Sequence, residues 1–193
     1  MGKKDKNKNV IVSPSFVEKL EYYLKSKSHI MKYYALSSIE NGISPSNNNL
    51  ATMIENTEII SSIVSLLTSI NDILREQAAR TAALICITES GRKEFFDAGG
   101  SKILCQTLED LPSISIAAAG AICNLIHNQS YKQQLVNEAL IHALLKLFAK
   151  VTDKERETIV MTLVAIAHSS TFSSFSSFVL SSYLFLSFLL VIR

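Results

Sequence analysis

The sequence predicts an all-α fold in which short helical repeats stack into a right-handed α-solenoid. The first observation is a pattern of small, large, variable, variable and large residues that occurs four times: ALSSI at 35–39, ALICI at 83–87, AICNL at 121–125 and TLVAI at 162–166. Its second position recurs at intervals of 48, 38 and 41 residues. The second observation is a phrase that ends on a large apolar residue, with intervals of 43, 41 and 40, at Leu24, Leu67, Leu108 and Phe148. Two markers that share a period of about 40 residues indicate a solenoid.

The composition is the third observation. Of the 193 residues, 48% are hydrophobic and 19% are charged, which suits a domain with a substantial packed core. The formal net charge of +2 is too close to balance to indicate wholesale nucleic-acid binding. Three cysteines in apolar surroundings cannot all pair with one another, which favours buried free thiols in a reducing, cytoplasmic or nuclear compartment.

The first element in chain order, residues 1–12, is a basic arm that we expect to be disordered. Its start, MGKKDKNKN, holds four lysines and one aspartate, and such a terminus is usually solvated. Targeting, or contact with an acidic surface, is the alternative. No apolar signal-peptide core follows it, so secretion is not supported.

The next elements show why helices should stack. In 59–67, apolar residues fall at 59, 60, 63, 64, 66 and 67, so this predicted helix is apolar over much of its circumference, as a helix between two neighbours requires. The following segment, 71–88, begins polar (NDILREQ) and continues with small residues (AARTAA), which allow close approach of adjacent helices. Before them, the loop NGISPSNNN at 41–49 is rich in turn formers and accounts for the 48-residue interval.

A helix corner is predicted in DAGGSKILCQTL. Gly99 and Gly100 separate a short helix with Phe95 and Phe96 from a longer one with Ile103, Leu104 and Leu108. Glycine adopts the left-handed or tight backbone that such a corner demands. Gly99 is therefore expected to have a positive φ.

The segment SGRKEFFDAGGSKILCQTLEDLPSISIAAAGAICNLIHN, 90–128, resembles an armadillo repeat. In that family a short helix ends at a glycine, a second ends in a leucine-rich phrase, and a third ends in Ala-Leu-x-x-Leu with a frequent asparagine, which Asn124 matches. The resemblance spans residues 13–168: a first repeat without its short helix, then repeats near 46–88, 90–127 and 130–168. The sequence departs from the pattern at the glycine corner, which is Ala139 in the last repeat and about Glu58 in the second.

The sequence contains no pattern of residues that points to catalysis or to a cofactor. The four histidines show no i, i+4 pair and no cysteine at metal-ligand spacing, which speaks against zinc; His127 and His142 are expected at the surface or at helix ends. No nucleophile elbow, Walker loop or dinucleotide motif occurs. We therefore expect a non-enzymatic protein.

The resemblance implies a concave face of stacked third helices that binds a protein or an extended peptide. The expected positions on this face, one turn apart, are Tyr34 with Ser38, Ala82 with Cys86, Gly120 with Asn124 and Met161 with Ala165, and the candidate binding residues are Tyr34, Ser38, Arg80, Asn124 and Met161. For the small residues Ala82 and Gly120, packing between helices is the favoured interpretation. The alternative function, a nuclear-import carrier or chaperone of basic cargo, lacks its signature, because importin-like members of the family use tryptophan and asparagine ladders and this chain has no tryptophan.

The last element, residues 169–193, is a Ser/Phe/Leu-rich apolar tail and not another repeat. Residues 169–192 carry no charge, and this low complexity leaves two alternatives open. The tail could anchor an adaptor in a membrane, although its apolar end at 178–192 would reach only about 22 Å as a helix against about 30 Å of hydrocarbon. It could equally be a gene-model artefact, a translated pyrimidine-rich intron that truncates a longer solenoid.

Overall fold

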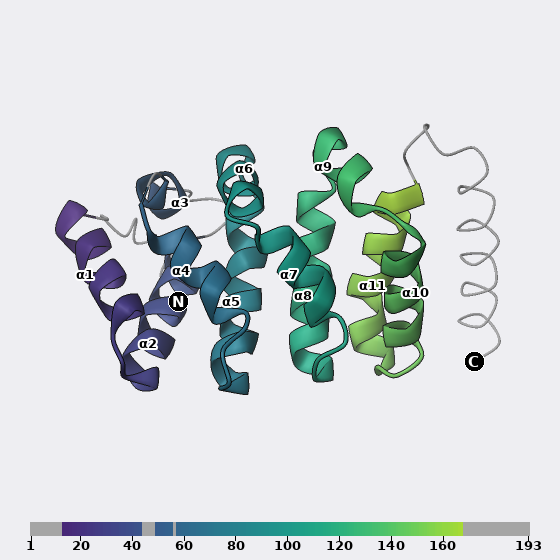
Figure 1. Cartoon of the computed structure of the whole chain (residues 1–193), viewed down its shortest axis with the longest axis horizontal. Coiled ribbons are helices and arrows are strands. Elements are labelled where there is room, and N and C mark those ends of the chain that lie inside the picture. Colours follow the sequence, from purple (N-terminus) through teal and green to yellow (C-terminus); the bar gives the residue numbers. More distant parts are fainter. Residues whose placement is uncertain (1–12, 44–48, 56, 168–193) are drawn as a thin grey trace, which may run out of the picture.

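The computed structural model describes residues 13–43, 49–55 and 57–167, and these ranges form a row of helices without a strand (Figure 1). The basic arm and the apolar tail predicted at 1–12 and 169–193 lie outside the described residues. The helices are α1 (Pro14–Lys25), α2 (His29–Gly42), α3 (Asn49–Ile54), α4 (Ile59–Leu66), α5 (Asp72–Ile85), α6 (Glu89–Asp97), α7 (Gly100–Thr107), α8 (Pro112–Leu125), α9 (Gln129–Leu135), α10 (Glu138–Phe148) and α11 (Asp153–Ala167).

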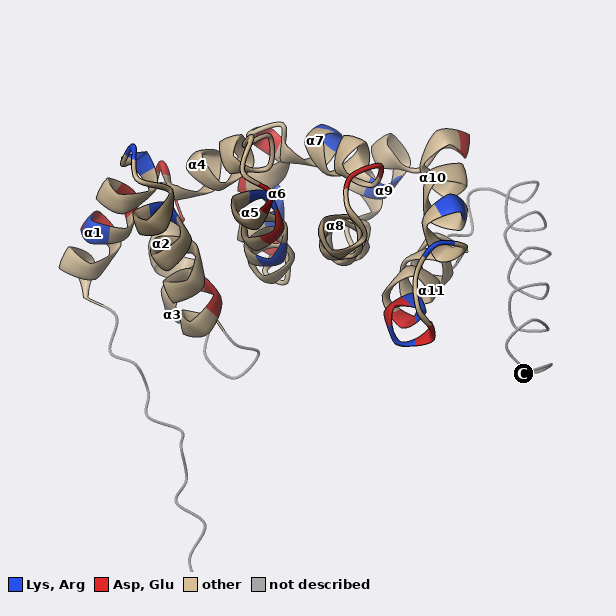
Figure 2. Ribbon diagram, turned by 90° about the horizontal axis from the view of Figure 1, so that it is seen from below, with Lys and Arg blue, Asp and Glu red and all other residues tan. Residues whose placement is uncertain are grey.

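The helices group into four repeats, which confirms the predicted all-α solenoid. The first repeat is α1 and α2, and the following three are α3–α5, α6–α8 and α9–α11. We call α2, α5, α8 and α11 the inner helices: α5 contacts α2 and α8, and α8 contacts α11. In Figure 2, α5, α8 and α11 lie along the concave side of the curved row, whereas α4, α7 and α10 lie along the other side. The short helices α3, α6 and α9 lie together at one edge of the stack in Figure 1.

Burial follows the periodic markers of the sequence. The large apolar residues that end the second marker, Leu24, Leu67, Leu108 and Phe148, are all buried. Helix α4 packs against both α1 and α5, and these contacts bury the apolar residues that cover most of its circumference. Helices α5 and α8 contact each other, and both carry alanines with no exposed surface. Small side chains of this kind let packed helices approach closely.

The corner between α6 and α7 has the predicted backbone. Gly99 has φ +77°, the left-handed region that favours glycine. Gly100 is required for a different reason, since an added Cβ would lie 2.4 Å from Cε1 of the buried Phe95 ring. In the second repeat, Glu58 does precede α4 at the corner.

The corner of the fourth repeat differs from the prediction. Ala139 lies inside α10 and not at the corner, which falls instead at Val136 and Asn137 with extended backbone. The Asn137 side chain accepts a hydrogen bond of 2.9 Å from the Leu140 backbone N–H and so caps the start of α10. Helix α10 has 11 residues, whereas α7, which follows Gly99, has 8.

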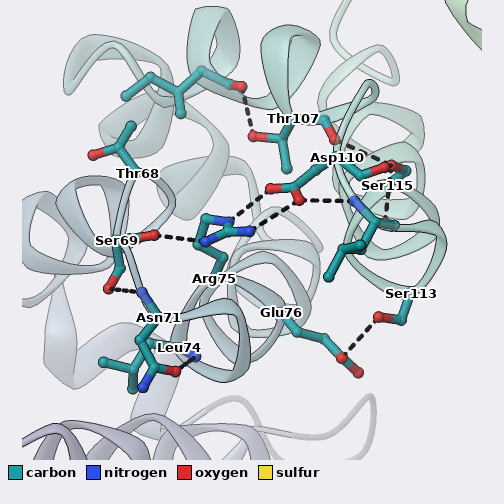
Figure 3. A network of polar contacts seen from close by, with 12 residues as sticks. Thr68, Ser69, Asn71, Leu74, Arg75, Glu76, Thr107, Asp110, Ser113 and Ser115 are labelled. Atoms are coloured by element: carbon teal, nitrogen blue, oxygen red, sulfur yellow. Dashed lines mark hydrogen bonds and ion pairs between the residues drawn. The ribbon is translucent and has the colours of Figure 1, made fainter.

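A network of polar contacts ties the second repeat to the third (Figure 3). The Arg75 guanidinium donates from Nε and Nη2 to both carboxylate oxygens of Asp110, at 2.7 and 3.0 Å, and from Nη1 to the Ser69 carbonyl at 2.8 Å. The hydrogen bond from Arg75 holds the pKa of Asp110 below its ordinary value. Both side chains are about four-fifths buried, and the bidentate pair holds the first turn of α5 against the turn that precedes α8.

Within the described ranges, none of the helices combines the length and the apolar character that crossing a membrane requires.

Candidate partner-binding face

The inner face is the surface that α2, α5, α8 and α11 turn toward the concave side of the row. Each helix presents to it the residues that are left exposed or half-buried after the helix has packed against its neighbours. The periodic sequence therefore places one residue from each repeat at each level of this face.

The helix bounds correct the predicted alignment of the second repeat. Helices α5 and α8 begin and end 40 residues apart, and the N-caps that follow them, Thr88 and Asn128, are also 40 residues apart. The position equivalent to 121–125 is therefore 81–85, two residues before the predicted 83–87. Ala82 and Cys86, predicted on the inner face, have no exposed surface; the packing interpretation of Ala82 is confirmed.

With this register, one level of the inner face consists of Tyr34, Arg80, Gly120 and Met161. Tyr34 is 63% exposed and Met161 56% exposed, and 53% of the Arg80 side chain is exposed. Gly120 is half-buried in the middle of this level. The long, solvent-exposed side chains of Arg80 and Met161, on the two helices that adjoin α8, thus stand on either side of a position that has no side chain.

The next level, one turn later along each inner helix, consists of Ser38, Leu84, Asn124 and Ala165, all half-buried. Ser38 donates its hydroxyl hydrogen bond to the Tyr34 carbonyl on its own helix at 2.7 Å. Asn124 donates from Nδ2 to the Ala83 carbonyl on α5 at 2.8 Å. The predicted candidate asparagine therefore lies on the inner face and also ties α8 to α5.

A chain of polar side chains crosses the inner face from α2 to α8. Nη1 of Arg80 lies 4.0 Å from Oε1 of Glu40 on α2, and Nε of Arg80 lies 3.3 Å from Oε1 of Glu76 on its own helix. The other Glu76 oxygen accepts a hydrogen bond of 2.9 Å from Ser113 on α8 (Figure 3). Gln77 donates to Glu40. Two carboxylates thus share one guanidinium at this end of the face.

The sequence interpretation missed Glu40 and Glu76. The i, i+4 spacing of Glu76 and Arg80 is a signal that could have shown the first contact. No local signal could show Glu40, because its position depends on how α2 packs beside α5.

The inner helices differ strongly in charge. Between Pro112 and Leu125, α8 has no charged residue, and half-buried Ile116, Ala117 and Cys123 accompany Gly120 on it. Helix α11 begins with the charged run DKERE. The middle of the inner face is therefore uncharged and lies between two charged regions.

The cysteines are free among the described residues, as predicted, but only Cys86 is fully buried. Burial raises the pKa of its thiol strongly. Cys105 and Cys123 are half-buried, and burial raises the pKa of each. His127 and His142 are exposed, as expected. No cluster of three His, Cys, Asp or Glu side chains suited to a metal ion occurs in the described ranges.

Comparison with solved structures shows an armadillo-like repeat fold. A designed armadillo repeat protein is 21% identical, with a TM-score of 0.74, and the match covers 81% of this chain and 67% of that one. A designed armadillo repeat protein in complex with the peptide (KR)4 is 22% identical, with a TM-score of 0.74, and covers 81% and 66%. An engineered protein is 24% identical, with a TM-score of 0.72, and covers 78% and 62%. The chain thus spans about two thirds of the length of these proteins.

No family model matches the sequence. No curated protein matches it either.

Proposed function

We propose that the chain is a non-enzymatic scaffold that binds a protein, in the form of an extended segment, along its inner face. The observation that carries the proposal is the level formed by Tyr34, Arg80, Gly120 and Met161. Three of the four repeats place an exposed aromatic, guanidinium or thioether group there, and side chains of these kinds are enriched at protein interfaces. One structurally similar designed protein is a complex with a peptide, which supports a peptide as the partner.

The regular spacing of the inner helices supports an extended partner over a compact one. Packed helices lie about 8–10 Å apart, and an extended chain advances about 3.3 Å per residue. A peptide that crosses the four inner helices would therefore meet each repeat with every second or third residue. A short peptide can thus contact every repeat, and each repeat contributes to the binding free energy of the whole peptide.

The two alternatives predicted from sequence have weaker support. A carrier of basic cargo that uses a tryptophan ladder has no counterpart here, since the chain lacks tryptophan and asparagine occupies one of the four positions at the Asn124 level. A membrane-attached adaptor depends on residues 169–193, which lie outside the described residues.

The test is an affinity capture with the full chain and two double variants of matched chemistry. Tyr34→Glu with Met161→Glu adds two carboxylates to the inner face at exposed positions, so the fold is expected to persist. The control, Ile70→Glu with Gln106→Glu, adds the same charge at exposed positions off the inner helices. We expect partners to be lost from the first variant and retained by the second.

Unchanged helicity by circular dichroism in both variants is the required control. Equal capture by the wild type and the Tyr34/Met161 variant would show that partners bind elsewhere on the chain.

A further inference from the structure

We propose that the partner of the inner face is a peptide with a bulky apolar side chain that lies over Gly120 and a basic residue two or three positions away that faces Glu40 and Glu76. This inference rests on the peptide-binding function proposed above and specifies the chemistry of the peptide.

The first observation is the missing side chain at Gly120, where a Cβ could be added without a clash. A Cβ added to Gly120 would meet one atom from a neighbouring helix within 4 Å, Cγ2 of Thr158 on α11. The distance of 3.6 Å is ordinary van der Waals contact. The equivalent residues on the neighbouring helices, Arg80 and Met161, are long and exposed. The level therefore has room for a partner side chain at its centre.

The second observation is that the surroundings of this space favour an apolar side chain. Helix α8 has no charged residue, and Cys123 is half-buried beside Gly120 along the helix. Met161 and Leu84 contribute apolar surface from the two adjacent inner helices. A charged partner residue would lose part of its water against this uncharged helix, whereas an apolar one gains from burial.

The third observation is an excess of negative charge on the α2 side of Gly120. Glu40 and Glu76 share the single guanidinium of Arg80, so among the described residues one of the two carboxylates has no cation of its own. A lysine or arginine of the partner would balance it, and the complementary charge would fix which way the peptide runs. Residues two or three apart in an extended peptide are separated by about 7–10 Å, which matches the distance between packed helices.

The experiment selects peptides from a phage-displayed library of random decapeptides with the full chain as bait. Recovered peptides are synthesised with a fluorescent label, and their affinity is measured by anisotropy. We expect an apolar residue of the size of leucine or phenylalanine and a lysine or arginine two or three positions from it.

Two pairs of variants locate the binding. Gly120→Leu fills the proposed space, and Gly120→Ala is its matched control because it adds a single methyl group in ordinary contact. Both replacements raise helix propensity, so the fold is expected to persist. We expect Gly120→Leu to weaken binding about tenfold or more and Gly120→Ala to change it less than about threefold.

Glu40→Gln with Glu76→Gln removes the excess charge, and Glu109→Gln, exposed in the turn after α7, is the control. We expect the double variant to weaken binding about tenfold and to reduce its dependence on salt. Melting curves of all variants establish that each is folded.

The outcomes separate the two proposals. If no peptide is enriched, both the proposed function and this inference are wrong. A second outcome is that peptides bind and their affinity falls in the Tyr34→Glu, Met161→Glu variant, which would show that the inner face binds peptides. If those peptides are acidic, or if Gly120→Leu leaves their affinity unchanged, this inference is overturned. If Gly120→Leu lowers the affinity and the Glu40/Glu76 variant does not, the basic residue proposed for the peptide is wrong.

Discussion

The third and fourth repeats build the same arrangement of three helices with different local chemistry. The third is tied to the second by charged and amide groups: Arg75 to Asp110, Glu76 to Ser113 and Asn124 to the Ala83 carbonyl. The fourth is tied to the third by the Thr162 hydroxyl, which donates to the Ala119 carbonyl at 3.2 Å. A stacked ring pair, Phe96 on α6 and Tyr131 on α9 with centroids 4.3 Å apart, adds to this second contact.

The corners of the two repeats differ in the same way. Gly99 supplies a left-handed residue before α7, whereas Asn137 supplies an extended residue with a side-chain cap before α10. What the repeats share is the placement of buried aliphatic and small residues. The packing of these residues therefore determines the stack, and the polar groups at corners and contacts are interchangeable means of stabilising it.

The largest effect is expected from the contact between the second and third repeats. Arg75→Ala removes three hydrogen bonds and leaves the mostly buried Asp110 carboxylate without its charged partner. We expect a loss of about 2–3 kcal/mol in the free energy of unfolding by urea. Lys93→Ala is the control, since its ion pair with Asp97 is exposed and 3.5 Å long; we expect almost no change. Equal small losses would mean that the Arg75 network contributes little.

The second test concerns the corners. Gly99→Val places a β-branched side chain at a φ of +77°, and we expect it to cost about 2 kcal/mol from backbone strain, since the space around Gly99 is open and no clash contributes. Asn137→Ala removes only a cap, with an expected loss of about 1 kcal/mol. Thermal and urea unfolding measure both. A larger loss for Asn137→Ala would reverse the comparison of the two corners.

Much of this organisation could be predicted from the sequence, and the errors have identifiable physical causes. The period and the Gly99 corner depend on local backbone and packing requirements that the residues themselves record. The register of the second repeat does not, because the pattern of small and large residues fits 83–87 better than its true position at 81–85, where Ala82 occupies the place of a large residue. The cap at Thr88 and the packing of α5 against α8 decide between them.

The candidate binding residues likewise differ in how far the sequence could place them. Tyr34, Arg80 and Met161 could be placed at the surface because the helical period fixes their direction once the repeat is known. The second role of Asn124, its hydrogen bond to α5, and the approach of Glu40 to Arg80 depend on which helices become neighbours. Contacts between residues about 40 positions apart arise from the stack, so no local pattern of residues shows them.

A smaller effect is expected at the contact between the third and fourth repeats. Thr162→Val keeps the shape of the fully buried side chain and removes its hydroxyl, whose single hydrogen is shared between the Ala119 carbonyl at 3.2 Å and the Thr158 carbonyl at 2.8 Å. We expect a loss of about 1 kcal/mol. Thr68→Val, at an exposed hydroxyl that bonds within its own turn, should have almost no effect. A loss as large as that of Arg75→Ala would show that the two contacts are equally dependent on polar groups.

The smallest effect is a pH dependence confined to the Arg75 and Asp110 contact. Because the hydrogen bond from Arg75 lowers the pKa of Asp110 in the folded protein, the folded state holds this proton less tightly than the unfolded chain does. The stabilisation is complete above the ordinary carboxyl pKa of 3.8 and is lost as the pH falls through the lowered folded value. Urea unfolding between pH 7 and pH 3 should therefore show wild type and Arg75→Ala converging at the acid end. Lys93→Ala, measured alongside, reports the acid sensitivity of the rest of the chain. A difference that stays constant down to the lowest pH would show that Arg75 acts through the Ser69 carbonyl and packing instead of through the Asp110 charge.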